Sequence, residues 1–259
     1  MTHALAAPAF MRAALRKGRK AGHALASPRG RRGLRLGAAA ALEHRGALAR
    51  VADDIGGAER MRCVLDVGAN AGQFSLLARE TFQNARIHAF EPLPGMADRF
   101  EALFADDAGT VLHRCALGAE RAEMAIHIAR APDSSSLLAP ALQEKFYPRA
   151  GASGRTESVP VRPLAELGIP VEAPALLKLD VQGYELEVLR GAGAVLDAIG
   201  HVYAELSHVE LYAGQPLAHE VIAFLAARGL FVAGVHVSDG GYDEKGRAVQ
   251  ADFLFSRAP

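Results

Sequence analysis

Residues 64–75, which read VLDVGANAGQFS, constrain the fold more than any other part of the chain. An apolar run with one acid, Asp66, breaks into a glycine-rich turn between Gly68 and Gly72, and a helical pattern of apolar residues follows. Strand, glycine turn and helix in this order are typical of an open parallel sheet that binds a nucleotide-sized ligand at the carboxyl ends of its strands. The glycines let the backbone approach such a ligand without an intervening Cβ. The segment therefore predicts a doubly wound α/β fold.

The same turn argues against two common nucleotide sites. A dinucleotide fingerprint requires glycine at positions where this chain has Asn70 and Gln73. A phosphate-binding loop requires Gly-Lys-Ser/Thr, which the segment lacks. The remaining pattern, Asp-x-Gly-x-x-x-Gly, suits S-adenosylmethionine, which has no pyrophosphate to bind. An ordinary strand-to-helix turn is the alternative.

A second acid follows the next predicted strand. Residues 86–90 (RIHAF) end in Glu91-Pro92, and Glu91 lies 23 positions after Gly68. A doubly wound sheet places the acid that accepts hydrogen bonds from ribose hydroxyls at about this spacing. Pro92 stops the strand and holds Glu91 in an extended conformation. We therefore expect Glu91 to bind a ribose, with a solvated surface glutamate as the alternative.

Strand and helix patterns alternate beyond residue 55 without an internal repeat, as expected for a parallel sheet covered on both faces. The predicted strands are 63–67, 86–90, 110–116, 123–128, 158–161, 175–180, 201–206, 230–236 and 251–256. The predicted helices are 72–83, 94–105, 184–197 and 216–228. Residues 132–136 and 148–158 are rich in Pro, Ser, Gly and Ala and predict exposed loops, where a substrate lid could sit. The turn at residues 240–241 predicts an antiparallel closing strand.

Charge is distributed unevenly along the chain. Residues 1–50 hold eleven Lys and Arg and a single acid, Glu43, so this segment carries +10 and the remaining 209 residues carry −10. We expect a basic extension over residues 1–50, helical or disordered, and a cofactor-binding domain over residues 51–259. A basic lead could contact an anionic membrane, nucleic acid or a phosphorylated carrier. Because Phe10 is the one aromatic residue among its charges, the nucleic-acid interpretation is weak.

Cysteine use and hydropathy indicate the compartment. Cys63 and Cys115 each fall inside an apolar strand pattern, and buried thiols favour a reducing compartment over a disulfide scaffold. No apolar run reaches membrane-spanning length. Arg12, Arg16 and Lys17 interrupt the N-terminal segment, so it does not read as a signal peptide. We therefore expect a cytoplasmic protein without a transmembrane segment.

Two further predicted strands carry acids at their ends. The nearly continuous apolar strand 175–180 ends in Asp180, and Glu205 lies at the end of strand 201–206. Both strands would end near the glycine turn, at the switch point of the sheet where ligands bind. A buried strand carries a charge only where something polar meets it. Asp180 and Glu205 are therefore candidate functional residues.

The motifs, in this order, resemble those of the FkbM-type methyltransferases. The matching segments are residues 66–72 with Ser75, residues 90–92, residues 135–137, residues 177–191 (LKLDVQGYELEVLRG), residues 205–212 and residues 252–255. The resemblance covers roughly residues 60–256 and leaves the basic lead uncovered. It implies the Rossmann-like fold of class I methyltransferases and transfer of a methyl group from S-adenosyl-L-methionine to a hydroxyl, often on a sugar or a natural product.

The chain departs from the family pattern in two places. The family commonly has Glu where Gln182 stands, and Thr-Leu-Asp where Pro163, Leu164 and Ala165 stand. The first departure is compatible with a tolerated variant. The second removes an acid near the sheet, so any role of that acid is in doubt for this chain.

Methyl transfer to a hydroxyl is an in-line displacement, to which a protein contributes chiefly by positioning and by a base within hydrogen-bond reach. The candidate bases are, in order, Asp180, Glu205 and His208. Asp180 could instead bind the methionine ammonium group, and Glu205 could cap a neighbouring helix. His208 and Glu210 have the spacing of a metal pair, but a third ligand is not in view, so we predict no metal site.

These inferences define the predicted site. The predicted catalytic residues are Asp180, Glu205 and His208. The predicted cofactor-binding residues are Asp66, Gly68, Asn70, Gly72, Ser75, Glu91, Pro92, Ala116, Leu117 and Asp180. The predicted partner is a small-molecule or glycan acceptor, nucleic acid is not expected, and the sequence leaves the oligomeric state open. A non-catalytic S-adenosylmethionine-binding or scaffold protein is the alternative, and Asn70 and Gln73 argue against a nicotinamide oxidoreductase.

Overall fold

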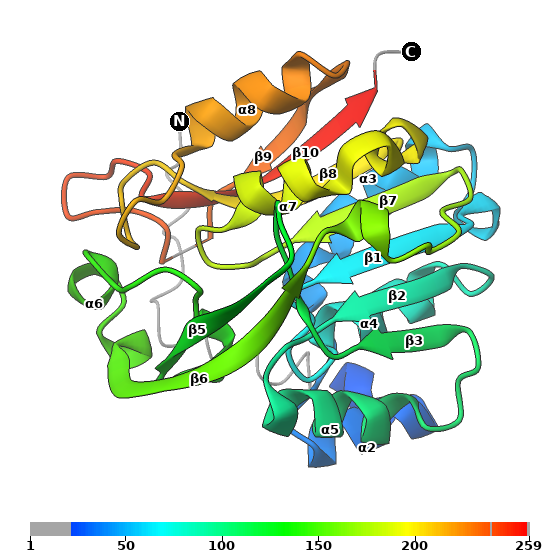
Figure 1. The fold of residues 1–259 in the computed structure, drawn as a ribbon. Coiled ribbons are helices and arrows are strands. Elements are labelled where there is room, and N and C mark those ends of the chain that lie inside the picture. Colours follow the sequence, from blue (N-terminus) through cyan, green and yellow to red (C-terminus); the bar gives the residue numbers. More distant parts are fainter. Residues whose placement is uncertain (1–21, 239, 258–259) are drawn as a thin grey trace, which may run out of the picture.

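A seven-stranded sheet with the order β3-β2-β1-β7-β8-β10-β9 forms the centre of the computed structural model, which describes residues 22–238 and 240–257. Its strands are β1 (Cys63–Val67), β2 (Arg86–Phe90), β3 (Thr110–His113), β7 (Ala175–Leu179), β8 (His201–Ser207), β9 (Leu230–His236) and β10 (Gln250–Arg257). The pairings among β1, β2, β3, β7 and β8 are parallel, whereas β10 is antiparallel to both β8 and β9. In Figure 1, β10 accordingly points the opposite way to β1 and β2. The predicted mostly parallel, doubly wound sheet with an antiparallel closing strand is confirmed.

The central strands are apolar along almost their whole length because helices cover both faces of the sheet. β1 (CVLDV) and β7 (ALLKL) are buried at every position. Each carries one charged residue, and these two residues, Asp66 and Lys178, lie opposite each other in register. The two charges therefore meet inside the sheet.

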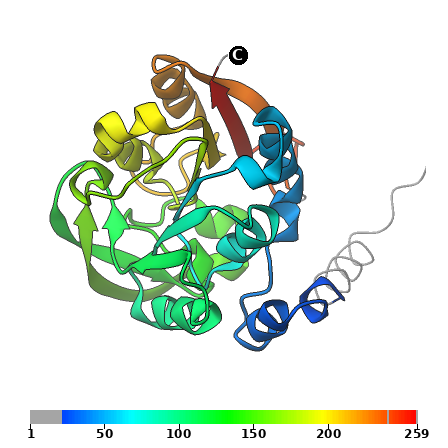
Figure 2. The ribbon, with the colours of Figure 1, turned by 90° about the vertical axis from the view of Figure 1, so that its right-hand side faces the viewer.

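Helices form a layer on each face of this sheet. On one face α7 (Glu185–Ala192) and α8 (Ala218–Ala226) pack on the core. On the opposite face lie α3 (Arg45–Asp54), α4 (Gln73–Thr81) and α5 (Pro94–Phe104). Figure 2 shows these two layers from a second direction. The result is a three-layer α/β/α molecule.

Most predicted elements agree with the observed ones to within a few residues. The predicted strands 63–67, 86–90 and 230–236 are found with the same bounds, and the predicted helices 72–83, 94–105 and 216–228 are α4, α5 and α8. The predicted helix 184–197 is divided, because α7 ends at Ala192 and a 3₁₀ helix, Gly193–Ala198, follows. Gly193 adopts a φ of +52°, which interrupts the α-helical path.

A second sheet lies at the carboxyl-end side of the first. Its order is β4-β6-β5, with β4 (Ala116–Leu117), β5 (Ala122–Ala129) and β6 (Ala152–Arg162). Figure 1 shows β5 and β6 on the side toward which the arrowheads of β1 and β2 point, with the short helix α6 (Gln143–Phe146) beyond them. The small sheet is therefore placed to cover the edge where a ligand would bind.

The small sheet corrects three sequence-based expectations. The predicted strand 110–116 ends at His113, and Ala116 begins a strand of the other sheet. The predicted loop 148–158 is wrong from Ala152 onward, because β6 pairs with β5 there. The predicted exposed loop 132–136 ends in Ser136, which is buried and bridges to His127. In each case a pairing with another segment, which local composition does not show, determines the structure.

The described part of the basic lead packs on the rest of the chain. α2 (Pro28–Arg35) contacts α5, and its Arg32 forms an ion pair with Asp106 at 2.9 Å. The predicted boundary at residue 50 falls inside α3, whose Leu48 and Val51 both lie in the core. The expectations for residues 1–21 lie outside the described residues. No helix among those described is both long enough and apolar enough to cross a membrane.

Candidate functional site

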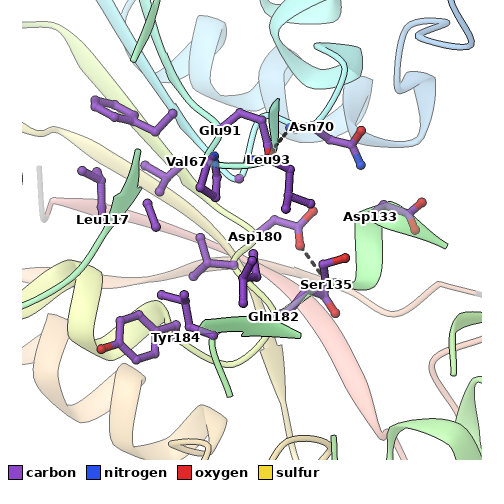
Figure 3. A pocket seen from close by; sticks show the side chains of 17 residues that line it. Val67, Asn70, Glu91, Leu93, Leu117, Asp133, Ser135, Asp180, Gln182 and Tyr184 are labelled. Carbon is purple, nitrogen blue, oxygen red and sulfur yellow. Dashed lines mark hydrogen bonds between the residues drawn. The ribbon is translucent and has the colours of Figure 1, made fainter. Parts of the chain in front are cut away.

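A pocket lies at the carboxyl ends of the central strands, between the main sheet and the small sheet (Figure 3). Its walls come from the turns after β1, β2 and β7 and from β4 and β5, so segments far apart in the sequence meet there. The lining combines apolar with acidic side chains, including Phe90, Leu93, Leu117, Ile126, Glu91, Asp133 and Asp180. An apolar pocket with a few convergent polar groups is the usual form of a small-molecule site.

The glycine turn after β1 is shaped by the close approach of another chain segment. Gly68 adopts a φ of +75°, and a Cβ built on it would lie 1.9 Å from the carbonyl oxygen of Asp180. Asn70 also has a left-handed conformation, with a φ of +50°, and its Oδ1 accepts a hydrogen bond from the Ala71 N–H at 2.6 Å. Glycine is therefore required at position 68 by a backbone contact, and not only by the space that a ligand needs.

Glu91 is a buried acid at the end of β2, with 5% of its surface exposed, and it lines the pocket. Its Oε2 accepts the Asn70 N–H at 2.9 Å, and its Oε1 accepts the Leu93 N–H at 2.8 Å. Burial raises the pKa of Glu91 to about 7, although these two hydrogen bonds favour the charged form. A carboxylate offers about four acceptor positions, so about two remain for the hydroxyl groups of a ligand.

Beneath the turn lies a buried ion pair. Lys178 Nζ is 3.1 Å from Asp66 Oδ1, and it donates hydrogen bonds to the carbonyl oxygens of Gly68 at 2.9 Å and Val67 at 3.3 Å. Ser75 Oγ donates to Asp66 Oδ2 at 2.6 Å. Burial opposes a charge on Lys178, but the carboxylates near it outweigh burial and raise its pKa. Lys178 is therefore a cation that joins β7 to the turn after β1.

On the far side of the turn, an amide joins two acids. Gln182 Nε2 donates to Asp180 Oδ1 at 2.8 Å and to Glu205 Oε2 at 3.0 Å. Asp180 lines the pocket and lies 3.7 Å from Lys178 Nζ. Desolvation, together with the charges of Asp180 and Asp252, raises the pKa of Glu205 well above its ordinary value. Ionisation of Glu205 is therefore disfavoured, whereas Asp180 is the acid that lies beside a cation.

Glu185 stabilises the turn that carries these groups. It is buried at the start of α7, and its Oε1 accepts the N–H groups of Val181 at 3.1 Å and Gly183 at 3.2 Å. Burial raises the pKa of Glu185 to about 7. The turn after β7 is thus held by a carboxyl group that is costly to ionise.

The structure brings most of the predicted cofactor-binding residues into one pocket. Those that line it are Gly68, Asn70, Glu91, Pro92, Ala116, Leu117 and Asp180. The others lie outside the lining. Asp66 and Ser75 are fully buried below it, and Gly72 packs against α5, where an added Cβ would lie 2.9 Å from the Phe104 ring. These three residues shape the turn from behind.

The predicted catalytic residues are placed differently from one another. Asp180 faces the pocket, and Glu205 is linked to it through Gln182. His208 is exposed, lies beside the Phe253 ring and is not part of the pocket lining. The structure therefore brings two of the three candidates together and leaves His208 apart.

Sequence reasoning missed several residues that build the site. Ser135 and Tyr184 line the pocket, and neither was assigned to it. Lys178 and Gln182 organise the acids. Lys178 carried a usable signal, because a lysine inside an otherwise apolar strand must meet a buried partner. Gln182 adopts a φ of +55°, and nothing in the local sequence indicates its bridging position.

The possible metal pair at positions 208 and 210 does not form a metal site. Glu210 Oε1 instead accepts the Gly214 N–H. Over residues 22–238 and 240–257, no group of three or more His, Cys, Asp or Glu side chains is arranged to hold a metal ion.

Comparison with known proteins places this chain in a family. A family model described as the methyltransferase FkbM domain matches residues 66–231. Methyltransferase 1 of Beauveria bassiana is 30% identical over 158 residues, which are 55% of this chain and 64% of that protein. Methyltransferase sdnD of Sordaria araneosa is 29% identical over 153 residues, which are 49% of this chain and 59% of that protein. The chain thus spans less than two thirds of the length of these curated relatives.

Solved structures with a partial likeness include a TehB-like SAM-dependent methyltransferase from Corynebacterium glutamicum. Its TM-score is 0.41 at 15% identity, over 84% of this chain and 92% of that one. A precorrin-6y C5,15-methyltransferase from Geobacter metallireducens has a TM-score of 0.42 at 12% identity, over 82% of this chain and 88% of that one.

Gly68→Val should destabilise the protein by roughly 3 kcal/mol or more, because the side chain would collide with backbone and a positive φ is unfavourable for valine. Urea unfolding measures the loss. Gly95→Ala in α5 is the matched control, since an added Cβ there meets no atom within 4 Å, and it should change the stability by less than about 1 kcal/mol. A Gly68→Val variant as stable as the wild type would contradict the turn geometry.

Stability should fall as pH rises through the range in which Glu185 ionises. Its pKa of about 7 in the folded chain exceeds the ordinary 4.5, so the folded state binds more protons between these values and loses stability as pH approaches 7. Glu185→Gln keeps an acceptor for the backbone N–H groups and removes the ionisation. Between pH 4.5 and pH 8, the free energy of unfolding should fall in the wild type by roughly 1–3 kcal/mol more than it falls in the variant. Equal pH dependence in the two proteins would argue against a buried neutral carboxyl.

Proposed function

We propose, from the premise that this chain belongs to the FkbM methyltransferase family, that it is an S-adenosyl-L-methionine-dependent O-methyltransferase. Membership of the family supports methyltransferase activity. The finer proposal is that the acceptor is a hydroxyl group of a sugar, a glycan or a natural product. The observation that carries it is one pocket in which the glycine turn and Glu91 meet Asp180, with Glu205 joined through Gln182.

The residues of the pocket fit this cofactor. Glu91 is a buried carboxyl group at the pocket wall with acceptor positions left for ribose hydroxyls. Leu93, Leu117 and Ile126 offer an apolar surface to an adenine ring. The acidic lining suits a cofactor that carries a positive sulfonium. When bound, the cofactor supplies an electrophilic methyl group.

Asp180 is the best-placed general base. Its carboxyl group lines the pocket, and the Gln182 amide and the Lys178 ammonium hold it in position. A hydroxyl group becomes a good nucleophile as its proton leaves, so a carboxylate within hydrogen-bond reach accelerates the transfer. Glu205, which the same amide holds in place, is assigned to orienting the acceptor by a hydrogen bond. Fixed positions for both groups lower the barrier chiefly through orientation.

A non-catalytic cofactor-binding or scaffold protein is the second candidate. Such a protein would need the glycine turn and Glu91, and would have no use for the linked acids Asp180 and Glu205. Incubation of fractionated lipid, glycan and small-molecule extracts with methyl-labelled cofactor distinguishes the two, because only the enzyme transfers label. A cytoplasmic location is part of the proposal and is supported by two buried free thiols, Cys63 and Cys115.

Glu91→Gln should weaken cofactor binding at pH 8 by about 1–3 kcal/mol, which is roughly 5- to 150-fold, since a neutral amide replaces the charged acceptor of the ribose hydroxyls. Calorimetric titration with S-adenosylmethionine measures the effect. Wild-type affinity should also fall as pH drops through about 7, where Glu91 gains its proton, and this fall should be smaller in the variant. Unchanged affinity in a folded variant would remove Glu91 from the site.

Asp180→Asn should lower the rate of methyl transfer on the order of a hundredfold or more at saturating cofactor. The amide of asparagine cannot take up the proton that leaves the hydroxyl group of the methyl acceptor. Glu205→Gln should cause a smaller or acceptor-specific loss. Initial rates with an active extract fraction measure both, and thermal unfolding controls for folding. Full activity of Asp180→Asn would leave Asp180 as a structural acid at the end of a strand.

A further inference from the structure

The Gln182 side chain occupies the space between two carboxyl groups that would otherwise face each other. Its Nε2 donates one hydrogen bond to Asp180 Oδ1 at 2.8 Å and one to Glu205 Oε2 at 3.0 Å. Both protons of the amide nitrogen are thereby used. The nitrogen lies between the two acids, as a metal ion that bridged two carboxylates would. It provides each acid with a hydrogen bond and carries no charge.

The orientation of this amide is determined from both of its ends. Tyr212 is buried, and its Oη accepts from Gln143 Nε2 at 2.9 Å. Its one proton faces Gln182 Oε1 at 2.7 Å and the Ser134 carbonyl oxygen at 3.0 Å. A flipped amide would turn its oxygen toward both acids and lose its hydrogen bonds to them. Gln182 also holds a φ of +55°, which is uncommon for a residue with a side chain. Tertiary contacts therefore maintain the bridge against a local backbone cost.

We propose that the Gln182 amide takes the place of a divalent cation between Asp180 and Glu205, and that the residue at position 182 determines whether this site binds a metal ion. The inference rests on the proposed function only in treating these acids as the acceptor side of a methyltransferase. A glutamate has the same shape and could still accept the Tyr212 hydrogen bond. It would replace the two N–H donors by an acceptor oxygen, so that three carboxyl groups converged with no donor between them.

Such a set of oxygen ligands is what Mg²⁺ and Mn²⁺ bind, at about 2.1 Å for Mg²⁺. The surrounding charges favour a cation there. Lys178 lies 3.7 Å from Asp180 but is already paired with Asp66 at 3.1 Å. Asp252, opposite Glu205 in register across β8 and β10, adds further negative potential. The chain therefore has most of the ligands of a divalent-cation site, and the Gln182 amide occupies the position between them.

Titration of the full chain with MnCl₂ tests this proposal without knowledge of the acceptor. By calorimetry, the wild type should have no site at this edge tighter than about 1 mM, and Gln182→Glu should gain one that is roughly a hundredfold tighter or more. Gln182→Ala is the matched control, because it removes the amide without adding a carboxyl group, and with only two carboxyl ligands it should bind Mn²⁺ at least about tenfold more weakly than Gln182→Glu. Adding Glu205→Gln to Gln182→Glu should abolish the new site.

Thermal unfolding covers the case in which Gln182→Glu is unstable. An ion that binds only the folded state raises the Tm by mass action, so MnCl₂ should raise the Tm of this variant, or restore its folding, and leave the wild type unchanged. A Gln182→Glu chain that gains nothing from Mn²⁺ contradicts the proposal. So does a wild type whose Mn²⁺ binding is lost in Asp180→Asn and Glu205→Gln. If the chain binds no S-adenosylmethionine, the proposed function is wrong. The outcome of the Mn²⁺ titrations does not depend on that result.

Discussion

The ion pair between Lys178 and Asp66 holds together the two turns from which the pocket is built. Both residues belong to central strands that are buried along their whole length, and they lie opposite each other in register. Loss of either partner would leave a buried charge uncompensated, at a cost of about 3–5 kcal/mol. Because Lys178 also donates to the Gly68 carbonyl, it keeps the turn after β1 against the end of β7. Position 68 has no room for a Cβ for the same reason.

Acidic side chains from distant segments gather around these turns. Burial raises the pKa values of Glu91, Glu185 and Glu205. Carboxyl groups with perturbed pKa values are concentrated at functional sites, and structural acids such as Glu185 share this property. Here backbone N–H groups, an amide and one ammonium group offset part of that cost. Such a pocket favours a ligand that brings hydroxyl groups and a positive charge.

The sequence predicts the parts of this structure that depend on local patterns. The glycine turn, the alternation of strands and helices, and the acids at strand ends were all visible in it, because each follows from residue types at short spacing. The small sheet and the Gln182 bridge were not, because they depend on pairings between residues far apart in the chain. Gly72 illustrates the difference, since the pattern indicated a ligand contact and the structure places the residue against α5. His208 illustrates it as well. Its position in the sequence, shortly after β8, could not show that its side chain lies outside the pocket lining.

The central claim is that this pocket is the cofactor site, with the ribose at Glu91 and the sulfur end toward Asp180. A crystal structure of the full chain with S-adenosylhomocysteine tests it most directly. The account predicts density in the pocket, with ribose hydroxyls within hydrogen-bond distance of Glu91 and the thioether sulfur on the side of Asp180. Density for the ligand in another cavity, such as the one that Tyr203 and Asp252 line beneath α3, would contradict it.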